Sequence, residues 1–143
     1  MKNYTLVLCR REELINGELV PQLLLGMKKR GFGVGKFNGF GGKLEPGETF
    51  RVAASRELEE ESGLKAPPEG LILRGMLLFF MRQSNMIMNV AVYESKDFSG
   101  EYIESDEMIP QWFNENKLPF ESMWPDDKIW MPSFLKRKNF IAR

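Results

Sequence analysis

Residues 42–64 read GKLEPGETFRVAASRELEEESGL, and this stretch is the most informative part of the chain. Its second half predicts a helix from Thr49 to Ser62, because Thr49 is a residue type that caps helix N-termini and Gly63 is the type that ends helices. At about 100° per residue, one side of this helix is apolar. We expect that side to face a core, and it consists of Phe50, Ala53, Ala54 and Leu58.

Three acidic residues at the end of the same helix break local rules. Glu57, Glu60 and Glu61 lie on the apolar side at spacings of three and four residues, where like charges repel. They also lie at the negative, C-terminal end of the helix, where acids destabilise it. A solvated acidic face would account for Glu59 alone. Because a divalent cation would turn this repulsion into coordination, we expect the three carboxylates to hold a metal.

The same stretch resembles the Nudix box, Gx₅Ex₇REUxEExGU with U an apolar residue, at every fixed position. The resemblance implies an α+β fold, an α/β/α sandwich around a mixed β-sheet, with residues 1–143 as a single domain. It also implies hydrolysis of a nucleoside diphosphate linked to another group, with Mg²⁺ as the cofactor or Mn²⁺ in its place. The metal ligands that it implies are Glu57, Glu60, Glu61 and the carbonyl of Gly41. Glu48 and Arg56 would brace the loop against the helix.

The rest of the chain predicts mostly strands. Apolar, β-rich runs lie at 4–9, 23–27, 71–81 and 86–93, with a further short strand at 110–113. The first two runs form a hairpin in which residues 11–21 make a long loop. Pro125, followed by two acids, starts a closing helix that runs towards Leu135. The chain ends at Arg143, without the pair of strands that the resemblance leads us to expect.

Composition limits the chemistry and the partners. The 143 residues include no histidine and one cysteine, Cys9, which excludes imidazole catalysis and a Cys/His zinc site. Any metal is then held by carboxylates, which favours Mg²⁺ or Mn²⁺. A lone cysteine and the lack of an apolar run long enough for a signal peptide or membrane span predict a cytoplasmic protein, by default a monomer. Twenty basic against twenty acidic residues argue against long nucleic acid as a partner.

Hydrolysis of a phosphoanhydride requires neutralised charge on two phosphates and a water molecule placed in line. Without histidine, a carboxylate must activate that water. Glu61 is the first candidate for this general base, and Glu107 is the second. Among the basic residues that precede the acidic helix, we expect only Lys28 to face the substrate.

Four segments outside the box resemble one branch of the family, the enzymes that hydrolyse oxidised purine nucleoside triphosphates: 26–33, 38–43, 104–108 and 123–127. The resemblance implies that Asn38, Asp126 and Asp127 hydrogen-bond the base and that Trp124 is the platform on which it stacks. It also implies that Phe32, Phe79 and Met88 form an apolar wall of the pocket and Thr5 its polar floor. It also implies that Glu107 is a further carboxylate beside the metals.

This chain departs from that branch at Phe37, where the branch has a tryptophan, and at Asn89, where it has an acid. Each pocket residue also has a plainer explanation. Trp124 is compatible with an ordinary core position, and Asp126 and Asp127 with acids that complement a helix N-terminus. If the two aspartates do share one apolar pocket, repulsion and burial are expected to keep one of them protonated near neutral pH.

The leading interpretation is an enzyme that converts oxidised purine nucleoside triphosphates, of the 8-oxo-dGTP and 2-oxo-dATP type, to monophosphate and pyrophosphate. Such an enzyme sanitises the nucleotide pool. The alternative is a broader Nudix pyrophosphatase that acts on methylated purine triphosphates, dinucleoside polyphosphates or ADP-ribose. A catalytically silent binding module would require loss of the acidic cluster, and Glu57, Glu60 and Glu61 are all present.

Overall fold

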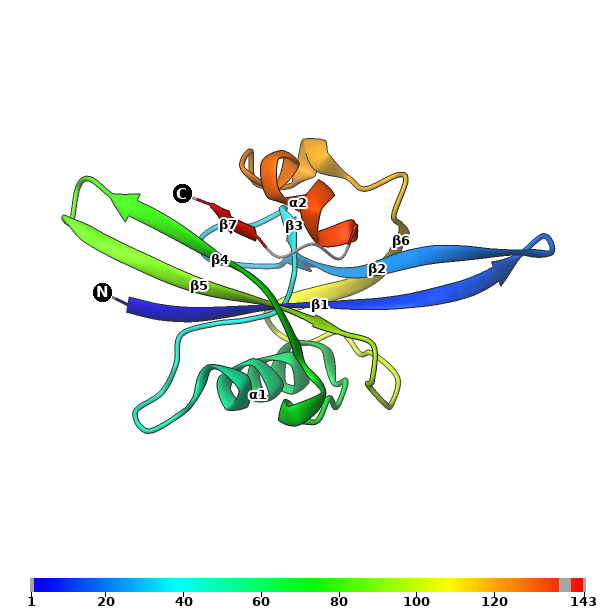
Figure 1. The fold of residues 1–143 in the computed structure, drawn as a ribbon, viewed down its shortest axis with the longest axis horizontal. Coiled ribbons are helices and arrows are strands. Elements are labelled where there is room, and N and C mark those ends of the chain that lie inside the picture. Colours follow the sequence, from blue (N-terminus) through cyan, green and yellow to red (C-terminus); the bar gives the residue numbers. More distant parts are fainter. Residues whose placement is uncertain (1, 137–139, 143) are drawn as a thin grey trace.

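A computed structural model describes residues 2–136 and 140–142 of the chain. Within these residues, a seven-stranded β-sheet separates two α-helices, one on each face (Figure 1). The strands are β1 (Lys2–Ile15), β2 (Glu18–Lys28), β3 (Phe37–Asn38), β4 (Ile72–Met81), β5 (Met86–Ser95), β6 (Met108–Asn114) and β7 (Phe140–Ala142). The helices are α1 (Phe50–Ser62) and α2 (Asp127–Leu135), with 3₁₀ turns η1 (Pro68–Gly70) and η2 (Phe120–Ser122).

The order of strands along the sheet is β3-β2-β1-β5-β4-β7, and β6 also pairs with β2. β1 runs parallel to β5 and β4 parallel to β7, whereas the other pairs are antiparallel. A mixed sheet between two helical layers is the α/β/α sandwich that the sequence predicts, so the expected fold is confirmed. None of the helices in the described ranges is long and apolar enough to cross a membrane.

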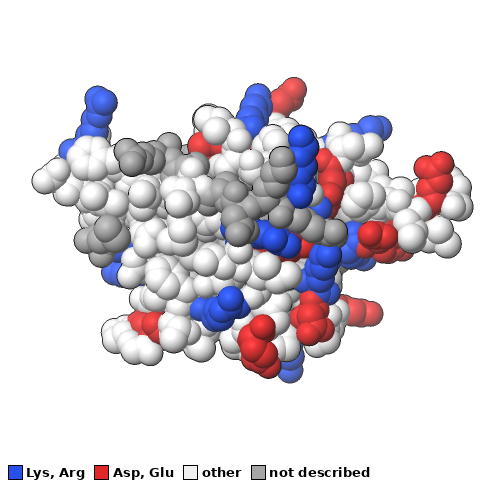
Figure 2. Space-filling model, in the orientation of Figure 1, with Lys and Arg blue, Asp and Glu red and all other residues white. Residues whose placement is uncertain are grey.

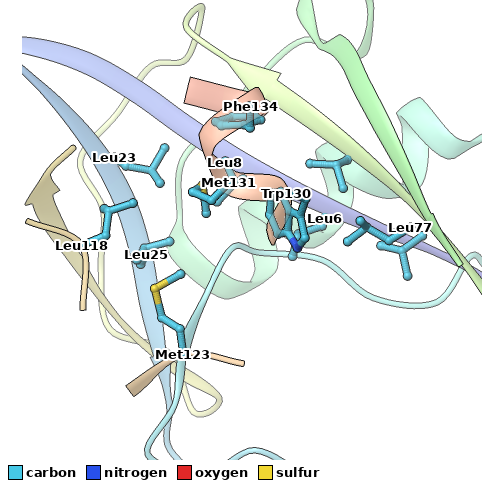
Figure 3. Close-up of a cluster of buried hydrophobic side chains, with 12 residues drawn as sticks. Leu6, Leu8, Leu23, Leu25, Leu77, Leu118, Met123, Trp130, Met131 and Phe134 are labelled. Carbon is cyan, nitrogen blue, oxygen red and sulfur yellow. The ribbon is translucent and has the colours of Figure 1, made fainter. Parts of the chain in front are cut away.

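The middle of β1 is buried on both sides, which explains its continuous apolar run. Leu6 and Leu8 belong to a cluster between the sheet and α2, whereas Val7 and Cys9 belong to a cluster on the face of α1. Alternate residues of a strand point to opposite faces, so one run of sequence contributes to two cores. Figure 3 shows the first cluster, in which side chains of α2 such as Phe134 pack onto leucines of the sheet.

The hairpin of β1 and β2 corrects one expectation. Residues 11–21 do not form a long loop, because both strands continue through this segment and a two-residue turn at Asn16 and Gly17 joins them. Both turn residues have positive φ, 51° and 81°, as a type I′ hairpin turn requires. Pro21 is compatible with the ribbon because β6 joins β2 only beyond it, which leaves Pro21 at an edge.

Other boundaries also differ from those expected. The closing helix α2 begins at Asp127 rather than at Pro125, because the segment before it closes a turn in which the Asp127 N–H donates to Trp124 O over 3.0 Å. β6 begins two residues before the expected start, at Met108, because that residue still pairs with β2. Beyond α2, residues 140–142 form a strand, β7, which pairs with β4, where the sequence predicted no strand.

The chain between β3 and α1 follows β1 closely. The N–H of Val7 donates to Phe40 O over 2.6 Å, and the N–H of Thr5 donates to Gly42 O over 2.9 Å. Gly41, between these contacts, has no room for a side chain, because a Cβ would lie 1.8 Å from Thr5 O. This close approach fixes where the loop delivers the chain to the start of α1.

Candidate active site

The helix α1 has the end groups that the sequence predicts. The Thr49 side chain accepts a hydrogen bond from the Val52 N–H over 3.2 Å, and Gly63 adopts a left-handed conformation with φ of 80°. Ala54 and Leu58 are fully buried in the cluster between α1 and the sheet. This packing brings the C-terminal half of α1, which carries the glutamates, against residues 39–49, the glycine loop between β3 and α1.

Arg56 joins the loop to the helix. Its guanidinium makes two hydrogen bonds to the Glu48 carboxylate, from Nε over 2.8 Å and from Nη2 over 2.9 Å. Such a fork matches the geometry of a carboxylate. The hydrogen bonds from Arg56, helped by the N–H of Glu45, lower the pKa of Glu48 to about 2. The structure thus places Arg56 and Glu48 where a brace between loop and helix is expected.

Arg56 also contacts two of the glutamates that are expected to bind metal. Its Nη1 lies 2.9 Å from Glu57 Oε1 and 3.3 Å from Glu60 Oε2. Burial raises the pKa of Glu57, while Arg56 opposes that rise. Gly42 leaves room for the Glu57 carboxylate, since a Cβ there would lie 2.7 Å from it. Glu57 therefore faces the loop, whereas Glu60 is 59% exposed at the same end of α1.

Glu61 is the glutamate of this group that lines a cavity. Its Oε1 accepts a hydrogen bond from the Gly41 N–H over 2.9 Å. Burial raises the pKa of Glu61 to about 7, against the lowering effect of that hydrogen bond. The contact seen at Gly41 is made by its N–H, and metal binding by its carbonyl stays a prediction.

The donor set suits a hard divalent cation. Carboxylate and carbonyl oxygens are the ligands that Mg²⁺ prefers, and Mg²⁺ is usually held by one or two carboxylates together with water and substrate phosphates. Among the described residues, no three acidic or sulfur-bearing side chains are grouped so that they would hold a metal by themselves. Glu57 and Glu61 both have pKa values raised by burial, and both contact or adjoin the loop glycines. This pair is the one that a cation would neutralise.

Glu107, the second candidate base, is paired with two cations. Its carboxylate lies 3.2 Å from Lys28 Nζ and 3.1 Å from Arg30 Nη2. The hydrogen bonds from Lys28 and Arg30 hold the pKa of Glu107 below its ordinary value. Ser105, which the sequence analysis did not single out, ties this loop to α1. Its hydroxyl donates to Glu61 O over 3.1 Å and accepts from the Glu107 N–H over 3.3 Å.

The cavity beside Glu61 has a volume of about 520 Å³, which suits a nucleotide-sized ligand. Every residue expected to bind substrate lines it: Thr5, Lys28, Phe32, Asn38, Phe79, Met88, Trp124, Asp126 and Asp127. The structure therefore brings together side chains from β1, β2, the loop 29–36, β3, β4, β5 and the segment 124–127 at the start of α2. Tyr4 and Trp130 line it as well, and the sequence analysis missed them because no motif contains them. Lys36 also lines the cavity, so the expectation that only Lys28 of the preceding basic residues faces this site is wrong.

Trp124 forms one wall of the cavity together with the loop 31–36. The centroid of its ring system lies 5.1 Å from that of Phe32, with 32° between the planes. Lys36 Nζ lies 5.3 Å from the Trp124 centroid, within the range of a cation–π contact. A Cβ at Gly33 would lie 3.1 Å from the same indole. Because Phe32 is otherwise 84% exposed, this wall borders solvent.

Polar groups share the cavity with these rings. The buried Thr5 hydroxyl has no hydrogen-bond partner within the described part of the chain. Asp126 accepts from the indole N–H of Trp130 over 3.2 Å, and Asp127 accepts from the backbone N–H of Trp124 over 3.2 Å. These contacts leave acceptor positions on both carboxylates that a ligand can use.

Asp127 is 3% exposed. Burial, followed by the neighbouring charge of Asp126, raises the pKa of Asp127 to about 7. A carboxyl with this pKa is partly protonated near neutral pH, so it is able to donate a hydrogen bond while its neighbour accepts one. That one acid of the pair carries a proton stays a prediction, which the burial of Asp127 supports.

Comparisons with known proteins give relatives along nearly the whole chain. A family model described as the NUDIX domain matches residues 5–134. The chain is 49% identical over 121 residues to the oxidized purine nucleoside triphosphate hydrolase of Danio rerio, which covers 85% of this chain and 76% of that protein. It is 46% identical over 140 residues to the protein of the same name from Mus musculus, which covers 97% of this chain and 83% of that protein.

Solved structures share the architecture. The crystal structure of a MutT protein from Bacillus halodurans matches with a TM-score of 0.75 at 19% identity, over 99% of this chain and 88% of that one. An Ap4A hydrolase of C. elegans matches with a TM-score of 0.68 at 18% identity, over 96% of this chain and 94% of that one. At such identities the likeness shows the fold alone. The match to the family model and the identity to the two vertebrate relatives show that the chain belongs to the NUDIX domain family of hydrolases.

Proposed function

We propose that this NUDIX hydrolase converts oxidised purine nucleoside triphosphates to the monophosphate and pyrophosphate, and so removes damaged nucleotides from the pool. One observation carries the proposal: a single cavity is lined by Trp124 and Asp127 and also by Glu61 of the acidic helix. A nucleotide needs both environments, one for its base and one for its phosphates. The names of the two vertebrate relatives support oxidised purines as the substrate class.

Base recognition combines stacking with hydrogen bonds. Trp124 offers an indole to the cavity, where stacking of a base contributes about 1–3 kcal/mol. Protonated Asp127 donates one hydrogen bond and a carboxylate oxygen of Asp126 accepts another, so the pair matches different purine edges by moving one proton. The Thr5 hydroxyl adds a group that donates or accepts. A buried polar group left unsatisfied costs about 1–3 kcal/mol, so a ligand that pairs with this hydroxyl is favoured.

The acidic end of the cavity performs the hydrolysis. Glu57, Glu60 and Glu61 would hold Mg²⁺, which would neutralise phosphate oxygens and lower the pKa of bound water. Glu61 accepts the proton of the attacking water, because its carboxylate lines the cavity whereas Glu107 is paired with Lys28 and Arg30. Lys28 also lines the cavity and supplies a positive charge for the phosphate chain. Arg56 keeps the loop and the helix in register through Glu48.

The substrate is a small nucleotide rather than a long nucleic acid. The formal net charge is zero, and in Figure 2 basic and acidic side chains are interspersed over the described residues of the face shown. Long nucleic acid favours a continuous basic surface instead. A cytoplasmic location and a monomeric state remain expectations from the sequence.

The test is a comparison of kcat/KM for 8-oxo-dGTP, 2-oxo-dATP, dGTP and ADP-ribose in the presence of Mg²⁺. We expect both oxidised nucleotides to exceed dGTP by about tenfold or more, because a site that hydrogen-bonds a base discriminates against one that leaves its polar groups unpaired. Glu61→Gln serves as the inactive control for contaminating phosphatases. Comparable values for all four nucleotides would contradict the proposal and favour a broader pyrophosphatase.

A further inference from the structure

A buried ionic cluster lies at the C-terminal end of α2, away from the cavity. At its centre is Arg10 of β1, which is 7% exposed. Its Nε and Nη2 donate to the Glu115 carboxylate over 2.8 and 2.9 Å. Its Nη1 lies 3.6 Å from Glu94 Oε2 on β5, a side chain that is fully buried. None of these three residues lines the cavity, and none belongs to the acidic helix α1.

Arg10 also holds the backbone of α2. Its Nη2 donates to Leu135 O over 3.0 Å, and its Nη1 donates to Phe134 O over 3.4 Å. The guanidinium carbon lies 5.4 Å from the centroid of the Phe134 ring. The last carbonyls of a helix have no partner inside it, and a cation there also interacts favourably with the helix dipole. One side chain thus fastens the end of α2 both to β1 and to Glu115, the residue that follows β6.

This helix depends on such external contacts. It has nine residues, fewer than the 12–15 or so at which an isolated helix is even marginal, and Pro132 inside it lacks the N–H of a helical hydrogen bond. Trp130, Met131 and Phe134 pack it onto the sheet, but apolar packing is not directional. The Arg10 hydrogen bonds are directional, and they act along the helix axis at its last residues.

We infer that Arg10 is a positioning residue for base recognition: by fixing the end of α2 it sets where Asp126 and Asp127 lie in the cavity. The helix is about 13 Å long, so the residues that Arg10 contacts and the two aspartates lie at opposite ends of one short element. The inference rests on the proposed function. A misplacement of about 1 Å in a reacting complex costs up to about 100-fold in rate, so a small movement of α2 is sufficient.

The variant Arg10→Lys tests this inference. Lysine keeps a positive charge for Glu115 and Glu94, but its single ammonium lacks the fork that joins Glu115 to the two carbonyls. We expect KM for 8-oxo-dGTP to rise by about tenfold or more, with a smaller change for dGTP, so that the preference between them falls. A purely structural role would lower Tm and the concentration of active enzyme, and would leave KM and the preference unchanged.

Two further variants make the result decisive. Arg11→Lys carries the same change at the next residue of β1, where the side chain contacts Gln22 and Trp112 instead, and we expect no change in preference. Glu115→Gln removes the charge opposite Arg10 with little change in shape, and decides the matter if Arg10→Lys does not fold. We expect it to lower the preference in the same direction.

Each outcome bears on a different statement. A fall in preference for folded Arg10→Lys, with Arg11→Lys unchanged, supports the inference, whereas an unchanged KM and preference overturns it and leaves the cluster with stability alone. If Arg10→Lys does not fold, the same two outcomes are read from Glu115→Gln. A wild-type enzyme that does not prefer 8-oxo-dGTP over dGTP overturns the proposed function, and the inference with it.

Discussion

Replacement of Asp127 by asparagine removes a charge that the fold accommodates poorly. Burial and the charge of Asp126 raise the pKa of Asp127 from 3.8 to about 7. Between these two values the native state binds a proton that the unfolded chain has already released. Stability from the protonated Asp127 is therefore fully present below about pH 4 and is lost as the pH rises through about 7.

The structure sets the size of this effect. One pKa unit corresponds to about 1.4 kcal/mol, so the full change amounts to about 4 kcal/mol, of which about 3 kcal/mol falls between pH 5 and 8. The side chain is 3% exposed, so solvent screens this energy little. In a chain of this length 1 kcal/mol moves Tm by roughly 2–4 °C. Between pH 5 and 8, the Tm of the wild type should therefore fall by roughly 6–12 °C more than that of Asp127→Asn.

The measurement is thermal unfolding followed by circular dichroism at pH 5, 6, 7 and 8, at constant ionic strength. Asparagine is nearly isosteric with the protonated acid, so the two proteins should unfold at similar temperatures at pH 5. Asp97→Asn, a change at an exposed aspartate, controls for the loss of one negative charge and should follow the wild type. A Tm difference between Asp127→Asn and wild type that is the same at every pH would refute the reasoning.

Substitution of Asp126 or Asp127 should also change which oxidised purine the enzyme prefers. Asparagine presents a donor and an acceptor that do not exchange by protonation. Asp126→Asn and Asp127→Asn should therefore change the ratio of kcat/KM for 8-oxo-dGTP and 2-oxo-dATP unequally. If each variant scales both substrates by one factor at every pH between about 6 and 9, the pair acts only as acids at the start of a helix.

Three further predictions address the acidic helix, the aromatic wall and the glycine loop. Glu61→Gln should lower kcat by about 100-fold or more and leave the metal-free Tm unchanged or raised; a lower Tm with activity retained would make the acid structural. Trp124→Ala should raise KM through the loss of about 1–3 kcal/mol of stacking; a collapse of kcat at constant KM would assign Trp124 to the fold. Gly41→Ala places a Cβ 1.8 Å from the Thr5 carbonyl oxygen, so we expect the free energy of unfolding to fall by about 1–3 kcal/mol. A Tm equal to that of wild type would show that the loop moves freely.

The elements that the sequence predicted well depend on neighbours along the chain. The helix after Thr49 ends at Gly63 because its caps and apolar face all lie within one segment. The doubly buried centre of β1 was visible as an unbroken apolar run. The turn at Asn16 and Gly17 also had a local signal, but Pro21 obscured it, since only the position of β6 shows that Pro21 lies at an edge.

The helix that carries the acidic residues could be predicted from local sequence, because spacing along a helix places Glu57 and Glu61 without knowledge of the rest of the chain. The surroundings of each cavity side chain, and the further residues that reach the cavity, are visible only in the folded structure. Lys36 reaches Trp124, and Arg10 reaches Glu115, through contacts between segments whose register no local pattern encodes. The raised pKa of Asp127 has the same origin, because desolvation arises only when α2 packs against the sheet.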